Sequence, residues 1–281
     1  MKNIYLIGDL HGSFKPVRDF CSRNPALYRQ KDNVLICLGD FGANFFFNHR
    51  DEEFKTKLGK YPLTYFVIRG NHEERPSICA QKYPDEWTIE PYFGNYVYVE
   101  KKYPYIKYAS DEIAIYKIPY LANYYDITKE KDYKDDEMSV WSQYRILVIP
   151  GAYSVDKYHR LQMGWSWFEQ EQLSDAEMDF GKAMIYDNPK FDIVLSHTCP
   201  IIYEPTDLFL SFVDQSMVDK SMERFLGEIE YNIDYKLWCW GHYHAFRDYP
   251  RTDGRKRIML SAGEEVVKLK QIYNEDEVIK L

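Results

Sequence analysis

Short apolar stretches recur along the chain, and small or polar residues follow each of them. The stretches cover residues 3–7, 33–38, 63–68, 145–149, 191–195, 236–240 and 258–260. Runs this short that are apolar throughout, rather than at alternate positions, are typical of strands buried on both faces. We therefore predict a buried strand at each of these stretches.

Two segments between the predicted strands carry helical signals. Ser174 and Glu177 have the spacing of a capping box, which starts a helix by bonding its first free N–H groups. Residues 216–229 place a stripe of apolar residues, from Met217 to Ile229, on one helical face, and we interpret this stripe as core. Strands that alternate with helices indicate a layered α/β fold.

The middle of the chain has a different composition. Residues 83–125 are rich in tyrosine and contain four prolines, which favours strands and loops over helix. Residues 128–138 form a charge run, which predicts a solvated loop. Because no repeat or Gly/Ser-rich linker divides the chain, we predict a single domain over residues 1–281 with an elaborated middle at about 83–140.

Composition and charge exclude several classes of protein. The 281 residues are 45% hydrophobic and 28% charged, as in globular proteins, and no apolar run is long enough for a membrane span or a signal peptide. The net charge of −8 disfavours long nucleic acid and membrane partners but leaves nucleotides and short oligonucleotides open. Five cysteines without a Cys-x-x-Cys pair disfavour a disulfide framework, so we expect a cytoplasmic protein.

Polar side chains suited to metal binding follow the predicted strands. They are Asp9, His11, Asp40, Asn71, His72, His197, His242 and His244. Five of the seven histidines of the chain lie at these positions. Because open α/β sheets bind their ligands beyond the carboxyl ends of the strands, we expect these side chains to meet in one crevice.

The chemistry of these side chains predicts which ions they bind. Carboxylate and imidazole ligands without a thiolate suit Mn, Fe, Zn, Co or Ni better than Ca or a structural zinc. Two ions about 3.5–4 Å apart that share a carboxylate would use this many donors, and such pairs bind phosphoryl oxygens. We expect two divalent metal ions, first of all Mn²⁺, with Fe, Ni, Zn or Co as alternatives.

Five short motifs carry these residues. In chain order they are Gly8-Asp9-Leu10-His11-Gly12, Gly39-Asp40, Gly70-Asn71-His72-Glu73, Ser196-His197 and Gly241-His242-Tyr243-His244. In type and order they resemble the five motifs of the calcineurin-like metallophosphoesterases, and they span residues 8–244. The resemblance implies the α/β fold of that family, a central β-sandwich flanked by helices.

The resemblance also implies a role for each motif residue. The first metal would be held by Asp9, His11 and His244. The second would be held by Asn71, His197 and His242. Asp40 would bridge the two ions, a hydroxide between them would attack phosphorus in line, and His72 would protonate the leaving oxygen or steady the transition state. The one residue implied as catalytic, His72, would then contribute about 10²–10⁴-fold to the rate.

One motif departs from the Ser/Thr protein phosphatase branch that Arg69–Glu73 otherwise resembles. That branch continues its second motif as Gly-Asp-x-Val-Asp-Arg-Gly, where this chain has Gly39–Asn44. Ala43 replaces the Asp partner of the catalytic histidine, and Asn44 replaces an arginine that binds phosphate through a bidentate contact. The departure disfavours a dedicated protein phosphatase. Another arginine could take the place of the lost one, and the candidates are Arg69, Arg75 and Arg160. The alternative for each is a structural or surface role.

Two further segments allow two interpretations each. Residues 151–157 resemble a loop of small bacterial and phage members of the superfamily. They form either a tight turn capped by Ser154 or Asp156, or a rim of the active site. The tyrosines of the middle segment either pack a lid or edge hairpin, or provide a surface for stacking bases.

We therefore predict a metal-dependent hydrolase of phosphate mono- or diesters. The alternatives are a Ser/Thr-type phosphoprotein phosphatase and a phosphodiesterase acting on nucleotides or RNA ends, and nucleotide pyrophosphates are a third substrate class. A binding module on a degenerate phosphoesterase fold is the non-enzymatic alternative, although all seven ligand positions are filled. Purely structural metals are disfavoured because structural zinc sites tend to use cysteine.

Overall fold

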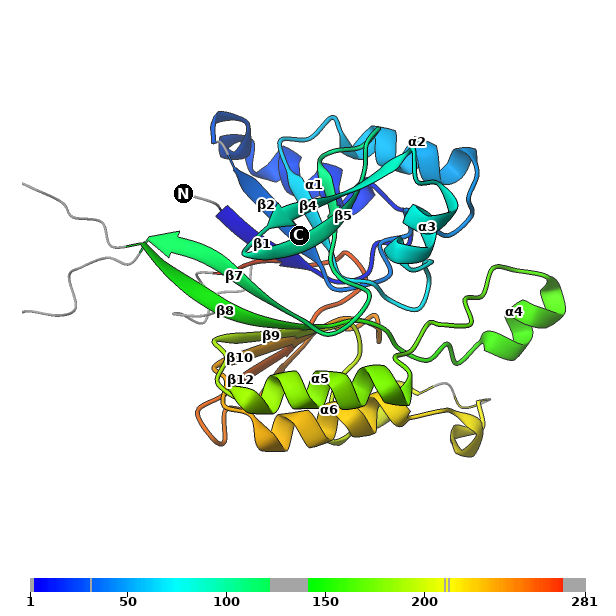
Figure 1. The fold of residues 1–281 in the computed structure, drawn as a ribbon, viewed down its shortest axis with the longest axis vertical. Helices are drawn as coiled ribbons and strands as arrows, with labels where there is room; N and C mark the ends of the chain where they lie inside the picture. The colour runs from blue at the N-terminus through cyan, green and yellow to red at the C-terminus, as the bar shows by residue number, and fades with distance from the viewer. Residues whose placement is uncertain (1–2, 31, 122–140, 210, 212, 270–281) are drawn as a thin grey trace, which may run out of the picture.

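The structure, a computed structural model, describes residues 3–30, 32–121, 141–209, 211 and 213–269. Two β-sheets lie at its centre, and helices cover the outer face of each sheet (Figure 1). In spatial order, the first sheet contains β13 (Val266–Lys268), β1 (Asn3–Ile7), β2 (Asn33–Cys37), β3 (Thr64–Val67), β6 (Ile106–Tyr108), β5 (Asn95–Glu100) and β4 (Trp87–Tyr92). The second sheet contains β11 (Arg247–Tyr249), β12 (Lys256–Met259), β10 (Leu237–Trp240), β9 (Ile193–Ser196), β8 (Trp141–Ile149) and β7 (Ala114–Leu121).

The helices form the two outer layers. The first sheet is covered by α1 (Lys15–Arg23), α2 (His49–Leu58) and α3 (Pro76–Lys82), and the second by α5 (Asp175–Asp187) and α6 (Ser221–Asn232). The short helix α4 (Lys157–Met163) projects from one end of the sandwich instead (Figure 1). This helix–sheet–sheet–helix arrangement confirms the α/β sandwich that the sequence predicts.

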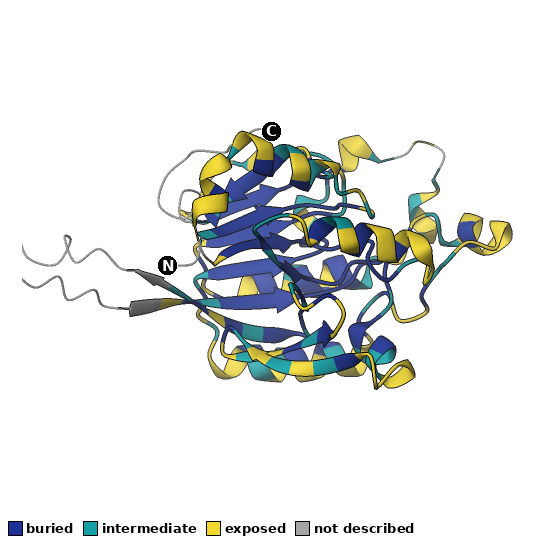
Figure 2. Cartoon of the chain, turned by 90° about the horizontal axis from the view of Figure 1, so that it is seen from above, coloured by how far each residue is buried: buried dark blue, intermediate teal, exposed yellow. Residues whose placement is uncertain are grey.

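The central strands are apolar on both faces because both faces are buried (Figure 2). Along β1, Ile4 and Leu6 face the second sheet, whereas Tyr5 and Ile7 face the helices of the first layer. Strand β10 alternates in the same way, and Trp238 lies on its helix-facing side. Side chains of a strand point to alternate faces, so an uninterrupted apolar run fits burial between a sheet and a helical layer.

Parallel pairing brings the ends of these strands together. Strand β2 pairs in parallel with β1 and β3, and β9 pairs in parallel with β8 and β10. The carboxyl ends of the three strands in each parallel set therefore lie at one edge of their sheet. The loops that follow β1, β2, β3, β9 and β10 carry the polar residues that the sequence singles out.

The two predicted helices differ in how well the sequence defines them. Ser174 and Glu177 form the predicted capping box at the start of α5. The prediction of a helix from residue 216 is wrong, because α6 begins at Ser221. Asp214 caps a single 3₁₀ turn at 215–217, and the chain then extends at Val218. Met217 is consequently 64% exposed rather than part of the core.

The described part of the tyrosine-rich middle forms strands and loops, as predicted. Strands β4, β5, β6 and β7 lie within it, and Tyr103, Tyr108 and Tyr116 are buried in the cores. These three tyrosines therefore support the packing interpretation. The charge run at 128–138 lies outside the described residues, and the division into a single domain stays a prediction.

The five cysteines are free and buried, as their apolar surroundings predict. Burial raises the pKa of each thiol, for example that of Cys21 to about 12, so these groups behave as small hydrophobic side chains. Among the described residues, no helix combines the length and the apolar character needed to cross a bilayer.

Replacing the cap of α5 tests how the sequence starts this helix. Ser174→Ala removes the side chain that accepts the Glu177 N–H at 3.3 Å. We expect the free energy of unfolding to fall by about 0.5–2 kcal/mol, because the first turn of α5 loses the acceptor of one of its N–H groups. Urea unfolding followed by circular dichroism measures the change. The exposed Ser22→Ala is the control, and equal midpoints for the two variants would contradict the role of the cap.

Candidate metal centre

Two buried carboxylates form the middle of the cluster. Asp9 follows β1 and Asp40 follows β2, and their residues are 1% and 2% exposed. Asp40 Oδ1 accepts the backbone N–H of His72 at 2.8 Å, and Asp9 Oδ1 accepts that of His242 at 3.1 Å. Asp9 Oδ2 has no hydrogen-bond partner within the described residues. Burying a carboxylate oxygen is costly unless a proton donor or a cation compensates it.

Three imidazoles approach these carboxylates on one side. His11 Nε2 and His244 Nε2 are 2.9 Å apart, and His244 Nε2 is 3.2 Å from Asp9 Oδ2. His11 Nε2 is also 3.9 Å from Asp40 Oδ2, as is His72 Nε2. Two ring nitrogens that face each other at this distance can share a proton or can bind one cation together.

The other side of the cluster is more deeply buried. His197 Nε2 lies 3.4 Å from Asp40 Oδ1 and 2.9 Å from Asn71 Oδ1. The ring of His242 packs edge-on against that of His197, with centroids 4.9 Å apart. His197 Nδ1 contacts the Leu38 carbonyl at 2.7 Å, a contact that fixes the ring and directs Nε2 into the cluster.

The donor set fits divalent metal ions. Among the described residues, three groups of side chains could each hold an ion, with ligand atoms within 4.8 Å of one another. These groups are Asp9–His11–His244, His11–Asp40–His72 and Asp9–Asp40–His197. The unpartnered oxygen of Asp9 and the facing nitrogens of His11 and His244 are the features that a cation would satisfy.

The structure thus brings all eight predicted site residues together, while His49 and His159 lie elsewhere on α2 and α4. Which ion each residue holds, and the catalytic role of His72, remain predictions.

The backbone around the cluster adopts unusual conformations. His11, Asp40, His242 and His244 all have positive φ angles, between 43° and 69°. This left-handed region is rare for residues with a side chain, and it persists where the surrounding structure compensates the strain. This backbone conformation lets short loops turn these side chains toward the cluster.

Burial and neighbouring charges shift the pKa values of the histidines in the cluster. Burial opposes the protonated form of His197, but Asp40 and Asp9 outweigh it and raise the pKa of His197 to about 9. Burial and then His197 lower the pKa of His242 to about 3. Burial together with Arg160 lowers the pKa of His72 to about 4. The carboxylates therefore already stabilise positive charge at the centre of the cluster.

Arg160 is the arginine of the three candidates that reaches the site. Its Nη2 lies 3.0 Å from His72 Nδ1 and also contacts Nε2, and its Nε lies 2.8 Å from Asp156 Oδ2. Arg69 donates to the backbone carbonyls of Gly70 and Glu171 instead. Arg75 pairs with Glu177 on α5.

The two substituted motif positions are buried in the first helical layer. Ala43 belongs to the apolar core there, and Asn44 is buried, with 4% of the residue exposed. Neither side chain takes part in the cluster, so the contact of Arg160 with His72 is the cationic contact that the site has in their place.

Sequence reasoning did not identify the residues that position Asn71. Ser154 Oγ accepts a hydrogen bond from Asn71 Nδ2 at 2.9 Å and donates to Glu171 Oε2 at 2.5 Å. This arrangement leaves Asn71 Oδ1 directed at His197. The signal was the segment 151–157, which the structure places against the cluster, in agreement with the rim interpretation. Ser154 does not cap a turn with its side chain, and Asp156 makes no side-chain cap at α4.

A second unpredicted support is Glu73, which follows His72 in the chain. Its carboxylate accepts the backbone N–H groups of Gly70 at 3.1 Å and of Phe41 and Gly42 at 3.4 Å. It thereby ties the loop after β2 to the loop after β3. Burial, followed by the charge of Asp40, raises the pKa of Glu73 to about 7.

Comparison with known proteins agrees with this geometry. The family model described as calcineurin-like phosphoesterase matches residues 2–246. The chain therefore belongs to the calcineurin-like phosphoesterase family, whose members act on phosphate esters and use divalent metals. No curated protein matches the chain by sequence.

Solved structures show the same fold at low sequence identity. The protein TT1561 of Thermus thermophilus is 10% identical with a TM-score of 0.50, over 99% of this chain and 97% of that one. GAP50, the anchor in the inner membrane complex of Plasmodium, is 11% identical with a TM-score of 0.50, over 93% of this chain and 71% of that one. At these identities the likeness establishes the fold alone.

A substitution at Gly39 tests how closely the loops must approach. Its φ is +104°, and a Cβ there would lie 2.0 Å from His197 Nδ1. Gly254, with φ +80°, has nothing within 4 Å of its Cβ position and is the matched control. We expect Gly39→Ala to lower the free energy of unfolding by about 1–3 kcal/mol more than Gly254→Ala, and to weaken metal binding. Thermal unfolding and metal titration measure both effects. Equal losses would show that His197 does not require this glycine.

Proposed function

We propose that this protein is a dinuclear metal-dependent phosphoesterase that hydrolyses phosphate mono- or diesters, with Mn²⁺ as the first ion to test. The observation that carries the proposal is the position of Asp40, whose Oδ2 lies 3.9 Å from His11 Nε2 and whose Oδ1 lies 3.4 Å from His197 Nε2. A carboxylate shared in this way is what a two-ion centre needs. The free, buried cysteines support a reducing compartment, so we also propose the cytoplasm.

The chain's own residues divide into two sets around Asp40. Asp9, His11 and His244 would hold one ion, and Asn71, His197 and His242 the other. Two such ions supply positive charge that offsets the charge developing on the phosphoryl oxygens and activate the attacking water. Ser154, Glu171 and the Leu38 carbonyl orient the donors of the second set.

His72 and Arg160 would act on the substrate rather than on the ions. His72 borders the cluster and is held by its backbone bond to Asp40 and by Phe45, whose ring stacks at 5.8 Å. Arg160 is a buried residue, 3% exposed, and its guanidinium offers donors beside His72. A phosphoryl oxygen at the cluster could accept from both, so we assign phosphate binding to Arg160 and transition-state stabilisation or leaving-group protonation to His72.

The non-enzymatic alternative is a binding module on a degenerate phosphoesterase fold. GAP50 shares this fold and is described as an anchor, so the fold alone does not establish catalysis. In this chain, however, every motif position that the family uses for metal carries a side chain able to bind one.

Metal reconstitution tests the proposed function. We would strip the protein with chelator, add Mn, Ni, Mg or Zn singly, and assay p-nitrophenyl phosphate beside bis-p-nitrophenyl phosphate. Restored hydrolysis is the expected result, and the ratio of the two rates separates monoesterase from diesterase substrates. Failure of every ion on both substrates would contradict a broad phosphoesterase and favour a binding module.

Removing the His72 imidazole tests its assignment. We expect His72→Ala to lower kcat by about 10²–10⁴-fold while the bound metal content stays the same, because the side chain acts on the substrate. Elemental analysis measures the metal, and steady-state kinetics measures kcat. His49→Ala, at an exposed histidine that begins α2, is the control. Loss of metal in parallel with activity would make His72 a ligand instead.

Arg160 gives a second test of the substrate side. We expect Arg160→Ala to lower kcat/KM by about 10–100-fold, since a charge-assisted hydrogen bond is worth about 1.5–3 kcal/mol. Arg160→Lys should restore only part of the loss, because lysine lacks the planar fork of donors. Inorganic phosphate should also inhibit Arg160→Ala more weakly. The exposed Arg23→Ala is the control, and an unchanged inhibition constant for phosphate would contradict the assignment.

A further inference from the structure

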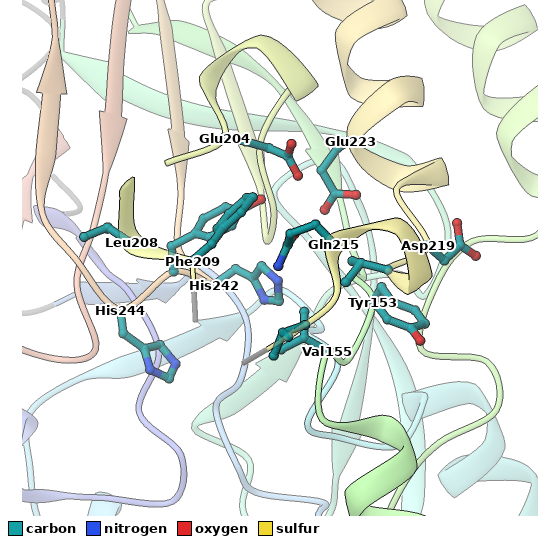
Figure 3. A pocket seen from close by; sticks show the side chains of 13 residues that line it. Tyr153, Val155, Glu204, Leu208, Phe209, Gln215, Asp219, Glu223, His242 and His244 are labelled. Carbon is teal, nitrogen blue, oxygen red and sulfur yellow. The ribbon is translucent and has the colours of Figure 1, made fainter. Parts of the chain in front are cut away.

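A pocket of about 270 Å³ opens beside the metal-ligand cluster (Figure 3). His242 and His244 belong to both, so a substrate bound at the cluster has this pocket next to it. The opposite walls come from residues 208, 209, 213, 215 and 218 and from the start of α6. Its volume is slightly below the range of about 300–1,000 Å³ typical of small-molecule sites, so it suits a group about the size of one ring with a substituent.

The walls of the pocket are largely apolar. Leu208, Val213 and Val218 line it together with the rings of Phe209 and Tyr243, which lie nearly parallel at 22°. Val218 lines it because the chain is extended there rather than helical. Apolar and aromatic walls favour an organic group with little charge.

Three carboxylates contribute to the lining of the pocket. Glu204, Asp219 and Glu223 line it, and no Lys or Arg is among the described residues that do. Glu204 is paired with Lys220 at 2.9 Å, and Asp219 accepts the Ser221 N–H. A further anion placed between these groups would be repelled across apolar walls that screen charge poorly.

Glu223 is the group that points to a ligand. The residue is 4% exposed, and Figure 3 shows its carboxylate directed from α6 toward Gln215. Oε1 accepts the hydroxyl of Thr198 at 2.7 Å, but Oε2 has no hydrogen-bond partner from another described residue. Burial raises the pKa of Glu223 to about 7. A buried oxygen of this kind is costly unless a donor satisfies it.

We propose that this pocket binds the organic group of the phosphate ester, and that it selects an apolar, ring-sized group without negative charge that presents an N–H or O–H donor to Glu223. The proposal rests on the proposed function. It favours esters of neutral or cationic alcohols over pyrophosphates and nucleoside diphosphates, whose second phosphate would bring an anion against Glu204, Asp219 and Glu223.

A matched series of aryl esters tests the selection by charge. We would compare 4-methylphenyl, 4-(aminomethyl)phenyl and 4-carboxyphenyl phosphate at pH 8, where Glu223 is mostly ionised. The expected kcat/KM for the carboxylate is at least tenfold below that of the methyl ester, and that for the amine equals or exceeds it. The carboxylate does not make phenoxide a worse leaving group, so a slower rate reports on binding. Equal values for the three esters would overturn the proposal.

Two variants of α6 separate the pocket from the overall negative charge. Glu223→Gln should reduce the discrimination against the carboxylate ester at least threefold. Glu228→Gln removes the same charge from the same helix, at a residue paired with Lys182 outside the pocket, and should leave the discrimination unchanged. Equal effects of the two variants would show that long-range charge, and not the pocket, selects the substrate.

Filling the pocket tests its size by a second route. Val218→Trp and Leu208→Trp should each lower the ratio of kcat/KM for 4-methylphenyl phosphate over methyl phosphate at least tenfold. Met217→Trp, beside Val218 but exposed and outside the pocket, should not change this ratio. Circular dichroism confirms that each variant is folded, and two filling variants guard against the failure of one.

Binding of the free phenols separates failure of this inference from failure of the proposed function. 4-Methylphenol and 4-(aminomethyl)phenol should bind the wild-type protein saturably in calorimetry, whereas 4-hydroxybenzoate and the filled variants should show no binding. If no ester is hydrolysed but the phenols bind in this pattern, the proposed function fails and the pocket assignment stands. If esters are hydrolysed but the filled variants bind and discriminate like the wild type, the pocket assignment is wrong.

Discussion

The structure depends on placing two carboxylates, Asp9 and Asp40, where water cannot solvate them. Each follows a central strand, and each is surrounded by imidazoles at 3.2–4.0 Å. Burying an ionised carboxylate costs several kcal/mol unless positive charge lies next to it. His197 Nε2 lies 3.4 Å from Asp40, and Asp40 and Asp9 raise the pKa of His197 to about 9. A divalent cation would provide positive charge more completely, and on this view the need for charge compensation gives the cluster its metal affinity.

The fold makes this placement possible through its strands and loops. Parallel strands deliver five loops to one place, and left-handed backbone at four of the site residues turns their side chains inward. Gly39 lets His197 lie against the loop after β2. The central strands of both sheets are apolar on both faces, so the stability of the cores that they form offsets the strain and desolvation at the loops.

The sequence predicts the parts of this arrangement that have a local signature. Strands buried on both faces appear as apolar runs, the capping box at Ser174 starts a helix, and polar residues after strands indicate a site at the strand ends. It does not predict where α6 begins. Asp214 caps a separate 3₁₀ turn at 215–217, and the chain extends at Val218 before the helix starts. The sequence names Arg160 only as one of three candidate arginines, since the contact with His72 joins residues 88 positions apart. The sequence singles out Ser154 only as part of the loop at 151–157, and its role follows from its hydrogen bond with Asn71, which the structure shows.

The substituted positions Ala43 and Asn44 show how the site differs from the protein phosphatase pattern that the sequence partly resembles. Both side chains lie in the first helical layer, and the guanidinium of Arg160 on α4 contacts His72 instead. Helix α4 lies at one end of the sandwich, apart from the two helical layers. The phosphate contact proposed for Arg160 would come from this helix, and such a contact can differ between relatives that share the metal ligands. This difference is consistent with function residing in the site rather than in the fold.

The most direct test of the central claim is anomalous X-ray diffraction from crystals of the protein soaked in Mn²⁺. The account predicts two anomalous peaks about 3.5–4 Å apart, with Asp40 between them, Asp9, His11 and His244 around one, and Asn71, His197 and His242 around the other. A single peak, or peaks that exclude Asp40, would contradict a two-ion centre built on this shared carboxylate.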